Sequence, residues 1–236
     1  MVRDPTARFA LRPYYENDEL DRECEHIVTT FLRGRHGSER YPITTDELTL
    51  LIEQEEAGLD SCVDLSGYGE DVEGVTAFYA GRPPEVMISD RLANDPRREN
   101  RLRTTLAHEF GHVRFHRHLW ADKLATGDLF AESAKAAKAI CKRDTILNAG
   151  QSDWMEWQAG YVSGAILMPA SAVRRLVDGY CTSKGLHGSV PLASDHGRVL
   201  IEAVKDEHQV SEEAARVRLS ALKILSGVPG APSLFS

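Results

Sequence analysis

The sequence predicts an α+β fold in which blocks of helix lie on either side of a short run of strands. Apolar residues recur every three or four positions before residue 58 and again after residue 96, as in amphipathic helices. Three short β patterns lie between these blocks, separated by turns rich in Gly and Pro. Because the strands follow one another without intervening helices, we expect a small antiparallel sheet followed by a long helix.

Two helices are expected before the strands. The first covers residues 21–33, has an apolar face built around Ile27, and ends at a glycine-rich break. The second begins at Thr45 and extends to about Ala57. Residues 1–20 are polar, and we expect them to form a flexible N-terminus.

The three β patterns cover residues 62–65, 75–79 and 86–89. Gly81 and the prolines after it mark a turn between the second and third patterns, which predicts a β-hairpin. The long helix begins soon after Pro96 and carries a stripe of apolar residues that is expected to face the core. This stripe consists of Leu102, Leu106, Phe110 and Val113.

The rest of the chain is expected to be mainly helical. A composition rich in Ala and Lys predicts one helix, and an apolar pattern that stops at Pro169 predicts the next. Ser211 is a good N-cap for the last helix. The expected helices cover 123–142, 152–167, a short segment after Pro169, 198–208 and 211–225, with a Gly- and Ser-rich loop over 179–197.

The length of 236 residues is enough for one good-sized domain with an appendage. We expect residues 21–180 to form the main domain. Residues 181–225 would then form a C-terminal helical segment similar to a helix-turn-helix, and residues 226–236 a flexible tail.

Composition excludes several classes of protein. The net charge of −8 argues against a protein that binds nucleic acid over its whole surface. No apolar run reaches transmembrane length, and the N-terminus lacks the apolar region of a signal peptide. The four cysteines are scattered without a C-x-x-C pair, as expected of reduced thiols. We therefore expect a cytoplasmic protein that makes no contact with a membrane.

Residues 108–112 read HEFGH, which matches the pattern H-E-x-x-H. On a helix, His108 and His112 lie one turn apart on the same face, where two imidazoles can bind one Zn²⁺. Glu109 lies about 100° around the helix, so it can reach a water on the metal without being a ligand. This layout is typical of a zinc hydrolase in which the glutamate is the general base.

A helix with two exposed histidines and a solvated glutamate is the alternative interpretation of this pattern. The apolar stripe around the motif argues against it, because the stripe places the segment against a core. Gly111 also costs ~1 kcal/mol relative to Ala inside a helix. It is therefore expected to have a packing reason, such as the close approach of a strand or a ligand.

A catalytic zinc needs a third protein ligand, and three residues are candidates. His118 has the spacing of the metzincin pattern, but Phe115 stands where that pattern needs Gly. His116 would lie about 12 Å from His108 on the same helix, too far to share one zinc, so a capping or surface role is expected. Glu156 on the next helix would complete a His₂Glu site, although the pattern alone is equally that of a surface carboxylate.

Three segments together resemble the ImmA/IrrE family of zinc metallopeptidases. They are TLAHEFGH over 105–112, DWMEWQAGYVSGAILMP over 153–169, and VSEEAARVRL over 210–219. With weaker matches at the strands, the resemblance covers roughly residues 59–225. The sequence departs from the family pattern at Gly160, where the family usually has Asn, and at Val162 and Ser163, where it has Phe and Ala.

The resemblance implies a zincin-like metallopeptidase domain with zinc held by His108, His112 and Glu156 and with Glu109 as the base. It implies an intracellular regulatory endopeptidase whose substrate is a protein, often a helix-turn-helix transcriptional repressor encoded nearby. Asp153 is expected to support a ligand histidine through a hydrogen bond.

Further expectations concern the substrate. An extended peptide can add to the edge of the sheet along residues 75–79 or 86–89. Tyr161 and His187 are candidates for stabilising an oxyanion, although a packing or loop role is the simpler interpretation of each.

Two other classes of function remain open at this point. The last two helices can form a DNA-binding module, with Arg216, Arg218 and Lys223 near phosphate, although the acidic residues around them favour a packed helical pair. Alternatively, the chain is a zinc-containing toxin or adaptor that acts by binding a partner protein.

Overall fold

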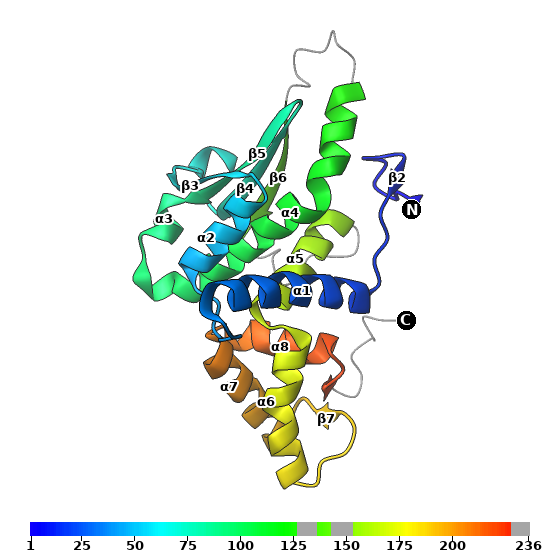
Figure 1. Ribbon diagram of the computed structural model, residues 1–236, viewed down its shortest axis with the longest axis vertical. Helices are drawn as coiled ribbons and strands as arrows, with labels where there is room; N and C mark the ends of the chain where they lie inside the picture. The colour runs from blue at the N-terminus through cyan, green and yellow to red at the C-terminus, as the bar shows by residue number, and fades with distance from the viewer. Residues whose placement is uncertain (127–135, 143–152, 228–236) are drawn as a thin grey trace. The chain divides into compact units, whose positions relative to one another are not determined.

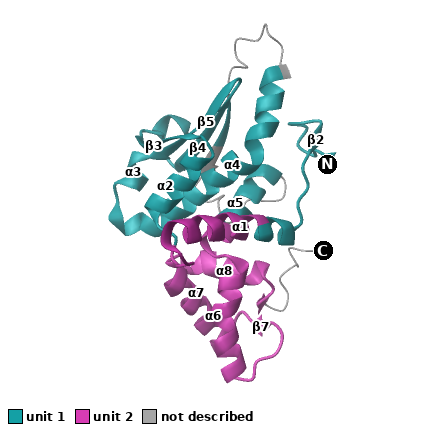
Figure 2. Cartoon of the chain, in the orientation of Figure 1, with its two compact units in different colours: residues 1–22, 43–163 teal, residues 23–42, 164–236 magenta. Residues whose placement is uncertain are grey.

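The computed structural model describes residues 1–126, 136–142 and 153–227. Helices and a small number of short strands make up this part of the chain, so the expected α+β class is confirmed (Figure 1). The chain divides into two compact units, and each draws on two separate stretches of sequence (Figure 2). The first unit contains residues 1–22 and 43–163, and the second contains residues 23–42 and 164–236.

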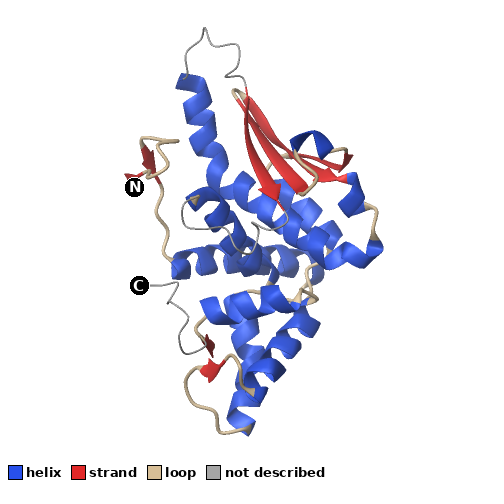
Figure 3. Ribbon diagram, turned by 180° about the vertical axis from the view of Figure 1, so that it is seen from behind, coloured by secondary structure: helices blue, strands red, loops and turns tan. Residues whose placement is uncertain are grey.

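A four-stranded sheet forms one layer of the first unit, and Figure 3 shows its strands in red. Its strands stand in the order β3-β5-β4-β6. Strands β4 and β5 form the expected antiparallel hairpin, and β6 pairs antiparallel with the other side of β4. The strands are β3 (Gly58–Val63), β4 (Val72–Tyr79), β5 (Arg82–Ser89) and β6 (Ala136–Lys142).

The expectation of a purely antiparallel sheet is wrong, because β3 pairs parallel with β5. The chain passes from β3 through a 3₁₀ turn, Ser66–Tyr68, into β4, which pairs with the other side of β5. Since β5 returns antiparallel to β4, it runs in the same direction as β3. The sheet is therefore mixed.

The prediction of a helix over residues 123–142 is also wrong for the second part of that range. Residues 136–142 form β6, while the preceding helix ends at Thr126 and residues 127–135 lie outside the described part. Lys138 is exposed and Ala139 is buried, which is the alternation of a strand. Differences in helix propensity amount to a few tenths of a kcal/mol per residue, so pairing along the length of β4 outweighs the Ala-rich composition.

Helix α4 covers Glu99–Thr126 and packs against β4. It starts after a 3₁₀ turn at Pro96–Arg98, where the sequence predicted a start, and its predicted apolar stripe is buried. Two shorter helices accompany it, α2 (Thr45–Gln54) and α3 (Asp90–Ala93). Thr44 caps α2 and, together with Glu47, forms a capping box.

Helix α5 covers Trp154–Leu167, close to the predicted range of 152–167, and it approaches α4 closely at Gly111. A Cβ at residue 111 would lie 3.1 Å from Cα of Ala159 and 3.3 Å from side-chain atoms of Val162. The expected packing reason for this glycine is therefore confirmed, and the neighbour is a helix.

The N-terminal residues are ordered against α5, in contrast to the flexible segment expected. Strands β1 (Val2–Arg3) and β2 (Leu11–Arg12) pair, and Asp4, directly after β1, is buried. Its carboxylate accepts hydrogen bonds from the backbone N–H groups of Thr6 and Phe9 and from Nε1 of Trp154, each at 2.9 Å. The segment is thus attached to the start of α5.

The second unit is mainly helical. It contains most of α1, which covers Asn17–His36, together with α6 (Ala170–Ser183), α7 (Asp195–His208) and α8 (Glu212–Ala221). Two short strands, β7 (Val190–Pro191) and β8 (Leu225–Ser226), pair parallel. Ser211 caps α8 as expected, through a hydrogen bond from the N–H of Ala214.

Several boundaries in this unit differ from those expected. Helix α6 extends to Ser183, so the expected loop over 179–197 is shorter and contains β7. The domain boundary expected at residue 180 falls inside α6, whereas the compact units separate after residue 163. Most of the expected tail, from residue 228 onward, lies outside the described residues. Within the described part, no helix combines the length and the apolar character that crossing a membrane requires.

Candidate metal centre

The two histidines of the HEFGH motif lie one turn apart on α4, as their spacing predicts. Both side chains are fully buried, so they are not exposed histidines on a solvated helix. Nε2 of His108 and Nε2 of His112 are 3.1 Å apart, and both face the same point.

Glu156 on α5 completes the group from a position 48 residues beyond His108. Its Oε2 lies 3.2 Å from Nε2 of His108, and its Oε1 lies 3.3 Å from Nε2 of His112. Burial raises the pKa of this carboxyl, but the adjacent His112 and His108 outweigh that effect and hold the pKa well below its ordinary value. The three residues can hold a metal ion.

Glu109 lies beside this group without belonging to it. Its side chain is fully buried and faces β4, where the hydroxyl of Thr76 donates a 2.5 Å hydrogen bond to Oε2. Gly74, two residues earlier on the same face of β4, borders the other carboxylate oxygen. Neither neighbour was predicted from the sequence, although a glycine inside a strand is a signal for a close approach.

His116 is not at the surface, in contrast to the role expected for it. Its ring is fully buried, with Nδ1 lying 3.0 Å from Nδ1 of His112 and Nε2 lying 2.8 Å from Oε1 of Gln158. Burial lowers the pKa of this imidazole well below its ordinary value. His116 thus lies directly behind a metal-ligand candidate. Its position depends on the packing of α5 against α4, which sequence spacing does not reveal.

The metzincin alternative is wrong, because His118 is exposed and lies outside the group. Helix α4 continues without a break to Thr126, so His118 cannot fold back toward His108. Phe115, which stands where the metzincin pattern has Gly, is buried within the helix.

Two supporting roles predicted from the sequence also differ. The carboxylate of Asp153 pairs with Arg8 through two hydrogen bonds, at 2.8 and 3.2 Å, and it supports the N-terminal segment instead of a ligand histidine. The hydroxyl of Tyr161 donates to Asp21 at 3.0 Å, so it is engaged in packing. His187 is an exposed residue of the second unit.

Neither strand predicted to receive a substrate has a free edge. Residues 75–79 belong to β4 and residues 86–89 belong to β5, and each of these strands is already paired on both sides. Among the described strands of this sheet, the edges are β3 and β6. The register places residue 141 of β6 opposite Gly74.

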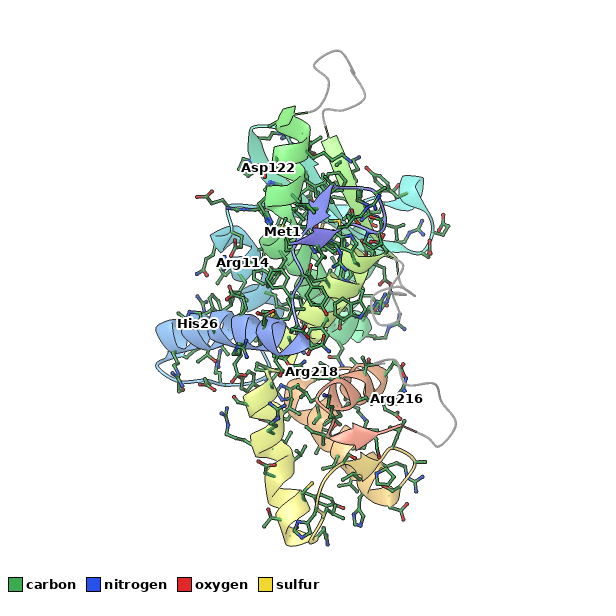
Figure 4. The ribbon with its side chains drawn as sticks, turned by 90° about the vertical axis from the view of Figure 1, so that its right-hand side faces the viewer. Met1, His26, Arg114, Asp122, Arg216 and Arg218 are labelled. Carbon is green, nitrogen blue, oxygen red and sulfur yellow. The ribbon has the colours of Figure 1, made fainter. Side chains whose placement is uncertain are left out.

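Two of the three basic residues considered for DNA binding, Arg216 and Arg218, are engaged within the second unit, whereas Lys223 is exposed. Arg218 is buried, and its Nε donates to the backbone oxygen of Met168 at 2.9 Å. Arg216 lies on the same helix as Arg218 (Figure 4). It pairs with Glu213. The buried guanidinium of Arg218 cannot reach a phosphate in this arrangement.

No protein-family model matches the sequence, and no curated protein matches it.

Proposed function

We propose that this protein is a zinc-dependent intracellular endopeptidase that cleaves a specific regulatory protein. The observation that carries the proposal is the convergence of His108, His112 and Glu156 beside a buried Glu109. The ImmA/IrrE resemblance supports the same assignment, with a transcriptional repressor as the expected substrate.

The donor set and its spacing favour zinc. Two imidazoles and one carboxylate form the ligand set of many catalytic zinc sites. Tetrahedral ligands at bond lengths of about 2.0–2.1 Å are separated from one another by about 3.3–3.4 Å. The two imidazole nitrogens are 3.1 Å apart, and each lies 3.2 or 3.3 Å from a different carboxylate oxygen of Glu156. With one donor atom from each residue, all three donors lie within 4.8 Å of one another.

Each residue of the site has a distinct role in this proposal. A bound zinc ion would supply a Lewis acid and lower the pKa of water. The carboxylate of Glu109 accepts the proton of the attacking water and later delivers it to the leaving amine. Because the hydroxyl of Thr76 holds Oε2, we assign the proton transfer to Oε1.

Among the described strands of the sheet, the outer edge of β6 is the best position for an extended substrate. A peptide that adds to an edge strand gains main-chain hydrogen bonds, while side-chain pockets supply selectivity. Strand β6 pairs with β4 next to Gly74 and Glu109, so a peptide along its outer edge would run past the base.

The test compares cells that express the wild type with cells that express Glu109→Gln, by mapping new protein N-termini with mass spectrometry. Glu207→Gln, at an exposed position on α7, is the matched control. We expect new termini in one or a few proteins with the wild type and the control, and none with Glu109→Gln. New termini that persist with Glu109→Gln would refute the mechanism.

The toxin or adaptor alternative makes a different prediction in the same experiment. A protein that acts by binding would produce no new termini with any variant. It would still retain its partner when Glu109 is replaced, because the substitution leaves the metal ligands in place.

A further inference from the structure

We propose that His116 and Gln158 are positioning residues that fix the tautomer of His112, so that its Nε2 presents a lone pair to the metal. The inference rests on the metal site of the proposed function and does not require peptidase activity. It assigns a role to two buried polar side chains that the metal group itself does not use.

The geometry is a chain of three side chains joined by two short contacts. Nε2 of His116 lies 2.8 Å from Oε1 of Gln158, and Nδ1 of His116 lies 3.0 Å from Nδ1 of His112. Each contact holds one hydrogen, and a neutral imidazole carries only one N–H. Gln158 accepts through Oε1, so His116 carries its hydrogen on Nε2 and its Nδ1 must act as an acceptor.

The second contact then determines the state of His112. Because Nδ1 of His116 accepts, Nδ1 of His112 must donate, and Nε2 of His112 carries no hydrogen. This is the nitrogen that lies 3.1 Å from Nε2 of His108 and 3.3 Å from Oε1 of Glu156. The lone pair required of a ligand is thus directed at the point where the group converges.

If the hydrogen bonds among these three side chains ran in the opposite direction, the site could not bind a metal. If the amide of Gln158 donated instead, His116 would carry its hydrogen on Nδ1, and His112 would accept there. Nε2 of His112 would then carry a hydrogen directed at Glu156, in the position that a metal must occupy. The orientation of one buried amide therefore separates a metal-ready site from a blocked one.

Burial keeps the tautomers of His112 and His116 fixed. His112 and His116 are fully buried and Gln158 is nearly so, which keeps water from replacing any member of the chain. The ring of His116 also makes a T-shaped contact with the ring of Trp154, with 5.5 Å between the ring centroids. The imidazole is therefore held in place as well as hydrogen-bonded.

Three substitutions test the proposal through zinc affinity, measured by competition with a chromophoric chelator. Gln158→Leu removes the acceptor and is expected to weaken zinc binding about 10- to 100-fold, as does loss of other partners of metal ligands. Gln158→Glu keeps an acceptor and is expected to bind zinc at least as tightly as the wild type. Ser163→Ala is the control, because its hydroxyl makes a buried hydrogen bond between the same two helices, to the backbone oxygen of Thr104. It should leave the affinity unchanged.

A second readout reports the tautomers directly. Long-range ¹H–¹⁵N NMR spectra of the metal-free protein are expected to show His112 protonated on Nδ1 and His116 on Nε2. A hydrogen on Nε2 of His112, or wild-type zinc affinity in a folded Gln158→Leu protein, would overturn the proposal. Failure of the peptidase proposal is distinguishable, because it would abolish the new N-termini while the zinc and NMR results stayed as expected.

Discussion

Gly74 of β4 and Glu109 of α4 face each other so closely that no side chain fits at residue 74. A Cβ there would lie 2.4 Å from Oε1 of Glu109 and 2.9 Å from Cγ2 of Thr105. The absence of a side chain at one strand position therefore creates the space for a buried carboxylate. The hydroxyl of Thr76, on the same face of the strand, then fixes its rotation.

Gly74→Ala is expected to impair catalysis while sparing zinc binding. The added methyl must displace the Glu109 carboxylate, and a shift of about 1 Å in a reacting group can lower kcat about 100-fold. The measurements are kcat on the substrate identified in cells and the zinc content of the purified protein. Gly67→Ala is the control, because a Cβ at residue 67 meets nothing within 4 Å. Full activity in Gly74→Ala would show that the Glu109 carboxylate does not depend on a glycine at residue 74.

Glu109→Gln is expected to keep its zinc and to lose about 10²- to 10⁴-fold in kcat. The amide keeps the shape of the side chain but cannot accept a proton, and general-base catalysis contributes about that much. Steady-state kinetics measure the loss of kcat, and metal analysis of the same preparation measures the zinc that is retained. A variant that lost zinc instead would identify Glu109 as a metal-holding residue.

Gly111→Ala is expected to destabilise the first unit by about 1–3 kcal/mol, as overpacking of a well-packed contact does. The new Cβ would lie 3.1 Å from Cα of Ala159, so α5 must move away from α4. Since α5 carries Glu156, zinc affinity should fall as well. Urea unfolding and zinc titration measure the two effects. Gly179→Ala, in a helix with free space at that position, should instead be neutral or stabilising.

Zinc is expected to stabilise the fold in proportion to its binding. A ligand that binds only the native state adds about 2.7 kcal/mol at a free concentration about 100 times its Kd. Thermal unfolding with zinc, and with a chelator, should therefore give a difference in Tm. Glu156→Ala should abolish most of that difference, and an equal shift in this variant would count against the third ligand.

Acid should weaken the attachment of the N-terminal segment. Burial raises the pKa of Asp4, but hydrogen bonds from Thr6, Phe9 and Trp154 outweigh it, so the pKa lies below its ordinary value of 3.8. A carboxyl with a lowered pKa in the folded state contributes stability that is present above the unfolded pKa and lost as the pH falls through the folded one. The difference in unfolding free energy between wild type and Asp4→Asn should stay constant above about pH 5 and shrink below pH 4. A difference that grows on acidification would contradict this sign.

Sequence patterns predicted the structural features that depend on the local spacing of residues. His108 and His112 stand one helical turn apart whatever surrounds them, and the buried stripe of α4 follows the same period. The sequence pattern around Glu156 does not decide its role, because nothing local distinguishes a metal ligand from a surface carboxylate. The family resemblance was needed to select it as the third ligand.

The features that the sequence did not predict depend on contacts between distant segments. His116 is buried because α5 packs against α4, and Gly74 meets Glu109 because β4 packs on the same helix. Residues 136–142 form a strand because β4 offers a partner, which outweighs their own preference for helix. Parallel pairing of β3 with β5 has no local signature at all.

Glu156 follows His108 by 48 positions in the sequence, and this separation also sets an order of events during synthesis of the chain. At about 5–20 residues per second, the ribosome adds the glutamate about 2–10 s after the first histidine. In the proposed metal site, a nascent helix alone would offer an ion only two of the three protein ligands. Tight capture would have to wait until the later helix has been made and has docked, so acquisition of the metal would mark a completed stage of folding in a newly made molecule.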